Sequence, residues 1–85
     1  MAYRVEIRAS AAKTIAALQR PQARRISDAI RGLADDPRPH GAIKMSGADA
    51  YRLRVGNYRI IYTIRDDIVT VTVTKVGHRR EVYRR

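Results

Sequence analysis

The last third of the chain has the most regular alternation of apolar and polar residues. Apolar side chains recur at every second position on each side of Gly56-Asn57, which is the pattern of two half-buried strands joined by a two-residue turn. We therefore predict strands at Tyr51–Val55 and Tyr58–Arg65. A third strand, Ile68–Val76, is predicted after a second two-residue turn at Asp66-Asp67, so that the three strands form an antiparallel meander.

Two-residue turns also determine which side chains share a face of this sheet. In this register Arg54 lies directly opposite Arg59 on one neighbouring strand, and Thr74 lies opposite Arg59 on the other. The predicted buried face carries Tyr51, Tyr58, Ile60, Tyr62, Ile64, Val69, Val71 and Val73. The predicted open face carries Arg52, Arg54, Arg59, Ile61, Thr63, Thr70, Thr72 and Thr74.

The first part of the chain predicts one strand and two helices. A short amphipathic strand is expected at Tyr3–Ile7, where apolar and charged residues alternate. Ser10 is the predicted N-cap of a helix that ends near Arg20, because a proline at the next position is tolerated only in the first turn of a helix. A second helix is predicted from about Pro21 to Ala34, with apolar residues at helical spacing.

The connections and the order of these elements predict the fold class. Residues 35–41 contain two prolines and a glycine and are expected to form a loop, and residues 42–50 are expected to be irregular. Residues 1–85 then form a single α+β domain. It is a two-layer sandwich of order β-α-α-β-β-β, in which a helical hairpin packs on one face of a mainly antiparallel four-stranded sheet.

Composition narrows the partners of this domain. Eighteen Lys and Arg against eight Asp and Glu give a net charge of +10, which favours a polyanion such as nucleic acid, a membrane surface or an acidic protein. Fifteen of these eighteen residues are arginine, whose planar fork suits phosphate. The chain has no cysteine and no apolar run near the roughly 20 residues of a membrane span. We expect a cytoplasmic protein that does not enter a membrane.

The arginines of the predicted open face are the first candidates for a functional site. Like charges directly opposite each other destabilise a sheet, so an anion bound beside Arg54 and Arg59 would compensate their repulsion. The alternative is that both guanidinium groups reach into water, where salt screens the repulsion. A second basic segment, residues 76–83, follows the last predicted strand, and we expect it to return beside this face.

The two histidines have different surroundings in the sequence. His78 lies in the basic tail and is a possible acid or base, because histidine ordinarily titrates near neutral pH; the alternative is a solvent-exposed side chain. His40 lies in the predicted loop and is expected to be solvated. Two separated histidines, no cysteine and no clustered carboxylates predict neither a metal site nor a cofactor.

Taken in order, these motifs resemble the RelE-type toxins of the RelE/ParE superfamily, which belong to bacterial toxin–antitoxin systems. The resemblance covers nearly the whole chain. It rests on a first strand opening on Tyr3, the helical hairpin, Lys44-Met45-Ser46-Gly47, Tyr51-Arg52-Leu53-Arg54, Tyr58-Arg59-Ile60-Ile61-Tyr62, and the tail from Gly77-His78-Arg79 to Val82-Tyr83. It implies a toxin of a type II system that inhibits translation as a metal-independent, ribosome-dependent mRNA endonuclease. RelE-type toxins promote attack of a ribose 2′-hydroxyl on the adjacent phosphodiester.

The resemblance also implies roles for the three arginines of the open face. Arg59, together with Arg52 and Arg54, would bind the RNA and stabilise the charge of the phosphorane-like transition state. Nuclease members of the family carry lysine at the positions of Arg52 and Arg54. The positive charge is therefore kept, whereas any role of a deprotonated amine is lost.

The tail would supply the proton transfers. By the resemblance, Arg79 would protonate the leaving 5′-oxygen, and Tyr83 would accept the 2′-hydroxyl proton or stack on the base. Arg80 would bind RNA, and a shift of one residue in the tail would exchange it with Arg79.

Two other functions stay open from the sequence. One is a ParE-like toxin that inhibits DNA gyrase without hydrolysing RNA, and the other is a basic RNA-binding module without catalysis. The tail with Arg79 and Tyr83 favours the nuclease, because ParE-like members lack it. The implied partners are the ribosome, mRNA and a small acidic antitoxin that folds as it wraps the toxin. We expect the toxin alone to be monomeric and its complex with the antitoxin to be larger.

Overall fold

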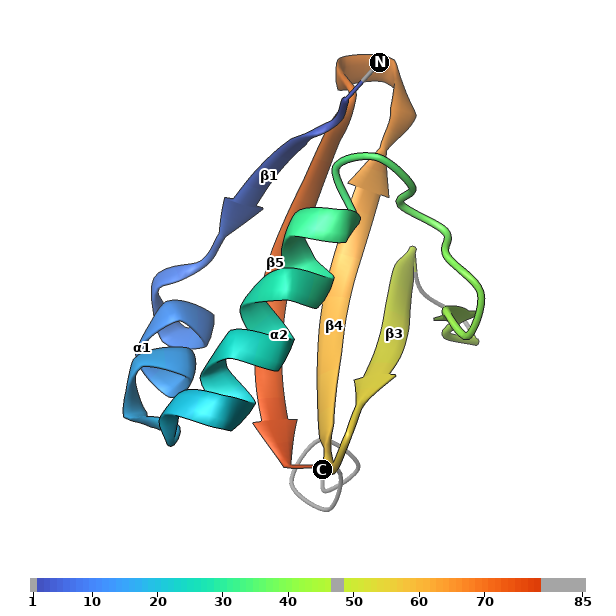
Figure 1. Ribbon diagram of the computed structural model, residues 1–85. Coiled ribbons are helices and arrows are strands. Elements are labelled where there is room, and N and C mark those ends of the chain that lie inside the picture. The colour runs from blue at the N-terminus through green and yellow to red at the C-terminus, as the bar shows by residue number, and fades with distance from the viewer. Residues whose placement is uncertain (1, 47–48, 79–85) are drawn as a thin grey trace.

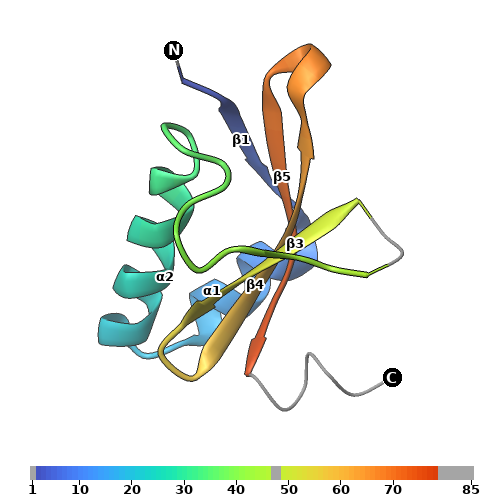
Figure 2. The same cartoon turned by 90° about the vertical axis from the view of Figure 1, so that its right-hand side faces the viewer.

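The computed structural model describes residues 2–46 and 49–78, which form two layers (Figures 1 and 2). One layer is a sheet with the spatial order β1-β5-β4-β3-β2. Its strands are β1 Arg4–Ile7, β2 Ile43–Lys44, β3 Ala50–Val55, β4 Tyr58–Arg65 and β5 Thr70–His78. The other layer contains the helices α1, Ala9–Ala17, and α2, Arg20–Gly32. β1 is parallel to β5 and the other pairs are antiparallel, so the predicted α+β sandwich is confirmed with one strand more than expected.

The additional strand, β2, lies within the segment that was expected to be irregular. Ile43 pairs with Arg52, and Lys44 pairs with Tyr51. A strand of two residues is too short to show a period of two in the sequence, so only its pairing with β3 reveals it. β2 forms one edge of the sheet, next to the strand that carries two of the candidate arginines.

The helix boundaries follow from the neighbouring strand and from one proline. The N–H of Arg8 donates to the carbonyl of Val73 at 2.9 Å, so strand pairing continues to Arg8 and α1 begins directly after it. The prediction that Ser10 caps this helix is therefore wrong. Ser10 lies inside the first turn, and the N-cap position is held by Arg8 without a side-chain bond. Pro21 lies in the first turn of α2, where its missing N–H removes no helical hydrogen bond.

The first hairpin has the predicted register. Val55 pairs with Tyr58 and Arg54 with Arg59 across the two-residue turn, in which Gly56 has a positive φ of 60°. One face of this hairpin packs against the helices. The core contains Ala11, Ile26, Ile30, Leu33, Ile60, Tyr62, Val71, Val73 and Val76.

The second hairpin differs from the prediction in two places. Asp66–Ile68 form a 3-10 turn and Val69 adopts a left-handed conformation at φ 51°, so the connection is longer than two residues. A β-bulge at Thr74 then adds one residue to β5. As a result Gly77, and not Thr74, lies opposite Arg59, and Val69 leaves the strand that was expected to bury it.

The bulge has a clear physical reason in the packing of β5. Val71 and Val73 are fully buried on the helix side, and a regular strand would place Lys75 on the same side. The extra residue reverses the alternation, so that Val76 enters the core and Lys75 stays exposed. Burying an unpaired ammonium group would cost far more than one irregular pair in the ladder.

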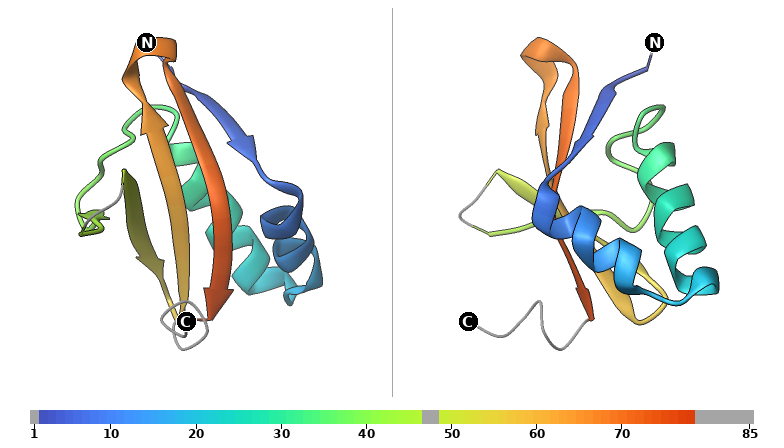
Figure 3. Two further views of the ribbon diagram at one scale, coloured as in Figure 1. Left: turned by 180° about the vertical axis from the view of Figure 1, so that it is seen from behind. Right: turned by 90° about the vertical axis from the view of Figure 1, so that its left-hand side faces the viewer.

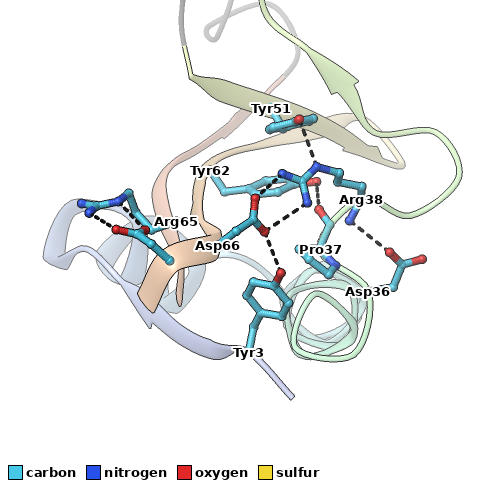
Figure 4. Close-up of polar contacts among 9 residues, drawn as sticks. Tyr3, Asp36, Pro37, Arg38, Tyr51, Tyr62, Arg65 and Asp66 are labelled. Carbon is cyan, nitrogen blue, oxygen red and sulfur yellow. Dashed lines mark hydrogen bonds and ion pairs between the residues drawn. The ribbon is translucent and has the colours of Figure 1, made fainter. Parts of the chain in front are cut away.

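A polar network ties the loop between α2 and β2 to the sheet (Figure 4). The hydroxyl of Tyr62 donates to the buried carbonyl of Pro37 at 2.9 Å. The guanidinium of Arg38 donates to the Asp66 carboxylate at 2.9 Å and, through Nε, to the Tyr51 hydroxyl at 3.2 Å. The loop is therefore fixed to β3, β4 and the β4–β5 turn at two consecutive residues.

The Tyr62–Pro37 hydrogen bond predicts a loss of stability on removing one hydroxyl. Tyr62→Phe should lower the free energy of unfolding by about 1–3 kcal/mol, because the buried Pro37 carbonyl loses its donor. Tyr3→Phe is the control, since the Tyr3 hydroxyl donates to Asp66 at an exposed position. Equal losses in both variants, measured by urea unfolding, would contradict a buried anchor at Pro37.

The same tyrosine gives the stability a dependence on alkaline pH. Burial, and to a smaller extent Tyr51, raises the pKa of Tyr62 to about 12. Because this exceeds the ordinary tyrosine pKa of about 10, the folded state binds the proton more tightly than the unfolded chain does. This contribution is complete below about pH 10 and is lost as the pH rises toward about 12. Measured by urea unfolding, the fall in the free energy of unfolding between about pH 10 and pH 12 should be smaller in Tyr62→Phe than in wild type.

Candidate functional site

Three arginines lie on the face of the sheet that the helices leave uncovered. This face is turned toward the viewer in Figure 3 (left), with the helices behind the sheet. Arg52 and Arg54 come from β3 and Arg59 from β4, and the register of the hairpin places all three on this face, as predicted. Arg54 is exposed and Arg52 is half-buried. Arg59 is only 6% exposed, which is unusual for an arginine.

These arginines line one hollow, which we call the arginine depression. It has a volume of about 460 Å³, within the usual range for binding sites of small ligands. Its described lining consists of His40, Gly41, Ile43, Arg52, Leu53, Arg54 and Arg59. Two of these residues precede β2 and one belongs to it, so the unpredicted strand forms a wall of the site.

The electrostatics of the depression favour an anion. Arg54 and Arg59 are direct cross-strand neighbours, whose Cβ atoms are about 4.5–5.5 Å apart in such pairs. No acidic side chain is among the described residues that line the hollow. Guanidinium groups offer planar, bidentate donors, so a phosphate group is the natural ligand.

The predicted tail residues cannot be placed beside this depression. Arg79, Arg80 and Tyr83 lie outside the described residues. His78, the last residue of β5, pairs with Tyr58, and the two rings meet edge to face with centroids 5.6 Å apart. Since Tyr58 packs against the core on the helix side, His78 lies on the opposite side of the sheet from Arg59.

The other histidine, His40, lies beside the candidate arginines, where a catalytic acid or base would be needed. His40 is exposed, as expected of a loop residue, but it lines the arginine depression. Sequence reasoning missed it because β2 was not predicted, and without β2 nothing brings the preceding loop beside Arg52. The signal in the sequence was a proline- and glycine-flanked histidine only three residues before Ile43.

The described residues offer cationic and imidazole groups but no cluster of metal ligands. Within residues 2–46 and 49–78, no three His, Cys, Asp or Glu side chains gather as a metal ion would require. No helix in this part of the chain is long and apolar enough to cross a membrane. The guanidinium groups that line the depression are suited to binding a phosphate and stabilising its charge, and an imidazole, that of His40, lies beside them.

A comparison with known protein families identifies the chain. Residues 5–83 match the model of the family described as the ParE toxin of the type II toxin–antitoxin system, parDE. The chain belongs to this family. It is a toxin of the RelE/ParE superfamily, as the sequence motifs indicated. A segment of 38 residues is 42% identical to Toxin RelG of Mycobacterium tuberculosis, covering 45% of this chain and 44% of RelG. The match thus spans less than half the length of that curated relative.

Solved structures of RelE proteins have the same fold. The archaeal RelE in the RelE–RelB complex from Pyrococcus horikoshii is 28% identical, with a TM-score of 0.80 over 93% of this chain and 97% of that chain. A mutant of the Escherichia coli toxin RelE in the free state is 27% identical, with a TM-score of 0.79 over 98% of this chain and 92% of that chain. These similarities support the α+β architecture over nearly all of the chain.

The repulsion between Arg54 and Arg59 should lower the free energy of unfolding of the free toxin. Arg54→Thr should raise the free energy of unfolding by a few tenths to about 1 kcal/mol at low salt, because it removes the charge opposite Arg59. The gain should shrink as salt screens the repulsion. Arg52→Thr is the control, since Arg52 lies opposite Ile61 on the same face. A loss of stability in Arg54→Thr at every salt concentration would contradict the repulsion.

Proposed function

We propose that this toxin is a ribosome-dependent mRNA endonuclease that inhibits translation without a catalytic metal. The observation that carries the proposal is the arginine depression, in which a nearly buried guanidinium, Arg59, lies beside Arg52 and Arg54. Guanidinium groups gathered on one face offer bidentate donors to a phosphodiester, whose negative charge would offset the repulsion between Arg54 and Arg59.

The reaction needs little more from the protein than position and charge. The 2′-hydroxyl oxygen of one ribose forms a bond with the adjacent phosphorus, and the bond from phosphorus to the 5′-oxygen of the next nucleotide breaks. One proton leaves the 2′-oxygen and one is delivered to the 5′-oxygen. Arg52, Arg54 and Arg59 hold the phosphate and stabilise the negative charge that develops on its non-bridging oxygens.

The tail completes the proposed mechanism. Arg79 protonates the leaving 5′-oxygen, with Arg80 as the alternative if the tail is shifted by one residue, and Tyr83 accepts the 2′-hydroxyl proton or stacks on a base. Arg80 otherwise adds to the RNA contact. These roles rest on the resemblance of the tail to that of RelE-type toxins.

The proposed partners follow from charge and family. Solved structures of this fold include RelB–RelE complexes described as complexes of an antitoxin with a toxin, and we propose a small acidic antitoxin for this chain as well. The toxin has a net charge of +10, which suits an acidic segment of the antitoxin that folds as it binds. The proposed site of action is the ribosome in the cytoplasm.

The second candidate function is inhibition of DNA gyrase. It is favoured by the family description, which names the ParE toxin. Such an inhibitor would act by binding protein and would not require phosphate contacts. Supercoiling by purified gyrase and mRNA cleavage on purified ribosomes, assayed with the same toxin preparation, separate the two functions.

Arg59 is the residue whose loss should affect cleavage most clearly. Arg59→Ala should reduce single-turnover cleavage of mRNA on purified ribosomes by about 10²–10³, because one charge contact to the transition state is removed. Expression of the Arg59→Ala variant in cells should no longer arrest growth. Arg65→Ala is the control, since Arg65 lies on the same strand but pairs with Asp67. Undiminished cleavage by Arg59→Ala would refute the proposed site.

The tail predicts a second ranking of variants. Arg79→Ala and Tyr83→Ala should both reduce cleavage severely, whereas His78→Ala should have little effect because His78 lies across the sheet from Arg59. Tyr83→Phe separates the two roles of the tyrosine. A drop of about 10²–10⁴ would indicate proton transfer, whereas a rate near wild type would indicate stacking. The reverse ranking of His78 and Tyr83 would contradict the assignment.

A further inference from the structure

The proposed mechanism has a weak point in its proton transfers. An arginine with a pKa above about 12 and a tyrosine with a pKa near 10 are poor proton donors and acceptors at neutral pH. Histidine is the side chain that ordinarily exchanges protons between pH 5 and 8. Of the two histidines in the chain, His78 packs against Tyr58 on the helix side of the sheet. His40 lies in the arginine depression.

His40 occupies a defined turn and not a loose loop. The N–H of Ala42 donates to the carbonyl of Pro39 at 3.0 Å, which closes a four-residue turn with His40 at its second position. Gly41, at the third position, has a φ of 95°, the conformation that a type II turn requires there. The turn directs the chain from the loop into β2, so His40 has a fixed position relative to Ile43 and its partner Arg52.

The residues before this turn are also fixed to the sheet. Tyr62 binds the carbonyl of Pro37, and Arg38 binds both Asp66 and Tyr51 (Figure 4). The backbone is thus held at two residues just before His40 and by β2 pairing just after it. A backbone that is already held on both sides loses less entropy when the side chain between the two anchors binds a substrate.

The groups that face His40 suit a phosphate placed between them. Arg52 and Arg54 from β3 and Arg59 from β4 are the charged groups among the described lining of the depression. A phosphodiester bound by these guanidinium groups would have its neighbouring ribose within the same hollow. His40 lies on the side of the hollow that the loop forms. None of the described residues that line the hollow with it is acidic.

We propose that His40 is the group that accepts the 2′-hydroxyl proton during RNA cleavage, an inference that rests on the proposed endonuclease function. Neutral imidazole takes the proton as the 2′-oxygen bonds to phosphorus, and the bond from phosphorus to the 5′-oxygen breaks. The 5′-oxygen receives its proton from the tail. The products are a 2′,3′-cyclic phosphate and a 5′-hydroxyl. Tyr83 is then left with the stacking role.

The test is the pH dependence of single-turnover cleavage on purified ribosomes programmed with one mRNA. In wild type the rate should rise with pH through the range in which histidine titrates. His40→Gln and His40→Ala should lower the rate at pH 7 by about 10²–10⁴ and remove this limb of the profile. His78→Ala, the matched control, should keep both the rate and the limb. Added imidazole should restore part of the rate of His40→Ala and not change that of wild type.

The outcomes separate this inference from the function on which it rests. A wild-type toxin that leaves mRNA intact would overturn both. Cleavage by wild type with an unchanged pH profile in His40→Gln would overturn the role of His40 alone, and the endonuclease would stand. A lower rate with an unchanged limb and no rescue by imidazole would indicate that His40 only shapes the turn, which also contradicts the proposal.

Discussion

The two-residue turn at Gly56-Asn57 is the constraint on which the rest of this structure depends. It fixes the register of β3 against β4, and a slip of one residue would exchange the two faces of the hairpin. In the observed register Ile60 and Tyr62 are fully buried under the helices, while Arg59, between them and the turn, points to the other face. One turn thus sets both the core and the site, so the strand that supports the fold also carries the central arginine.

The arrangement of the candidate site reduces the stability of the sheet. Arg54 and Arg59 face each other across the hairpin, and Arg59 is almost removed from water. The like-charge pair costs stability in the free protein, and an anion bound in the depression would offset this cost. Such a trade of stability for function is usual at sites that bind a charged ligand. On the other face of the sheet, Tyr62 packs in the core and its hydroxyl binds the Pro37 carbonyl. These contacts offset part of the stability that the like-charge pair costs.

Much of the fold could be predicted because it depends on local patterns. The period of two in β3, β4 and most of β5 and the position of Pro21 at the start of α2 predict the element order and the shared face of the arginines. The β-bulge at Thr74 and the two-residue β2 could not be predicted, because both exist only through contacts with residues distant in sequence. These two features decide the positions of the histidines. The bulge places His78 on the helix side, and β2 brings the loop with His40 to the arginines.

The most direct test of the proposed function is an analysis of the ends of RNA fragments. Purified ribosomes programmed with one mRNA are incubated with the toxin, and the fragments are examined at both new ends. Attack by the ribose 2′-hydroxyl predicts a 2′,3′-cyclic phosphate on one fragment and a 5′-hydroxyl on the other, with no cleavage when ribosomes are left out. Fragments with 5′-phosphate ends would contradict this chemistry. Intact mRNA together with inhibited gyrase would contradict the function itself.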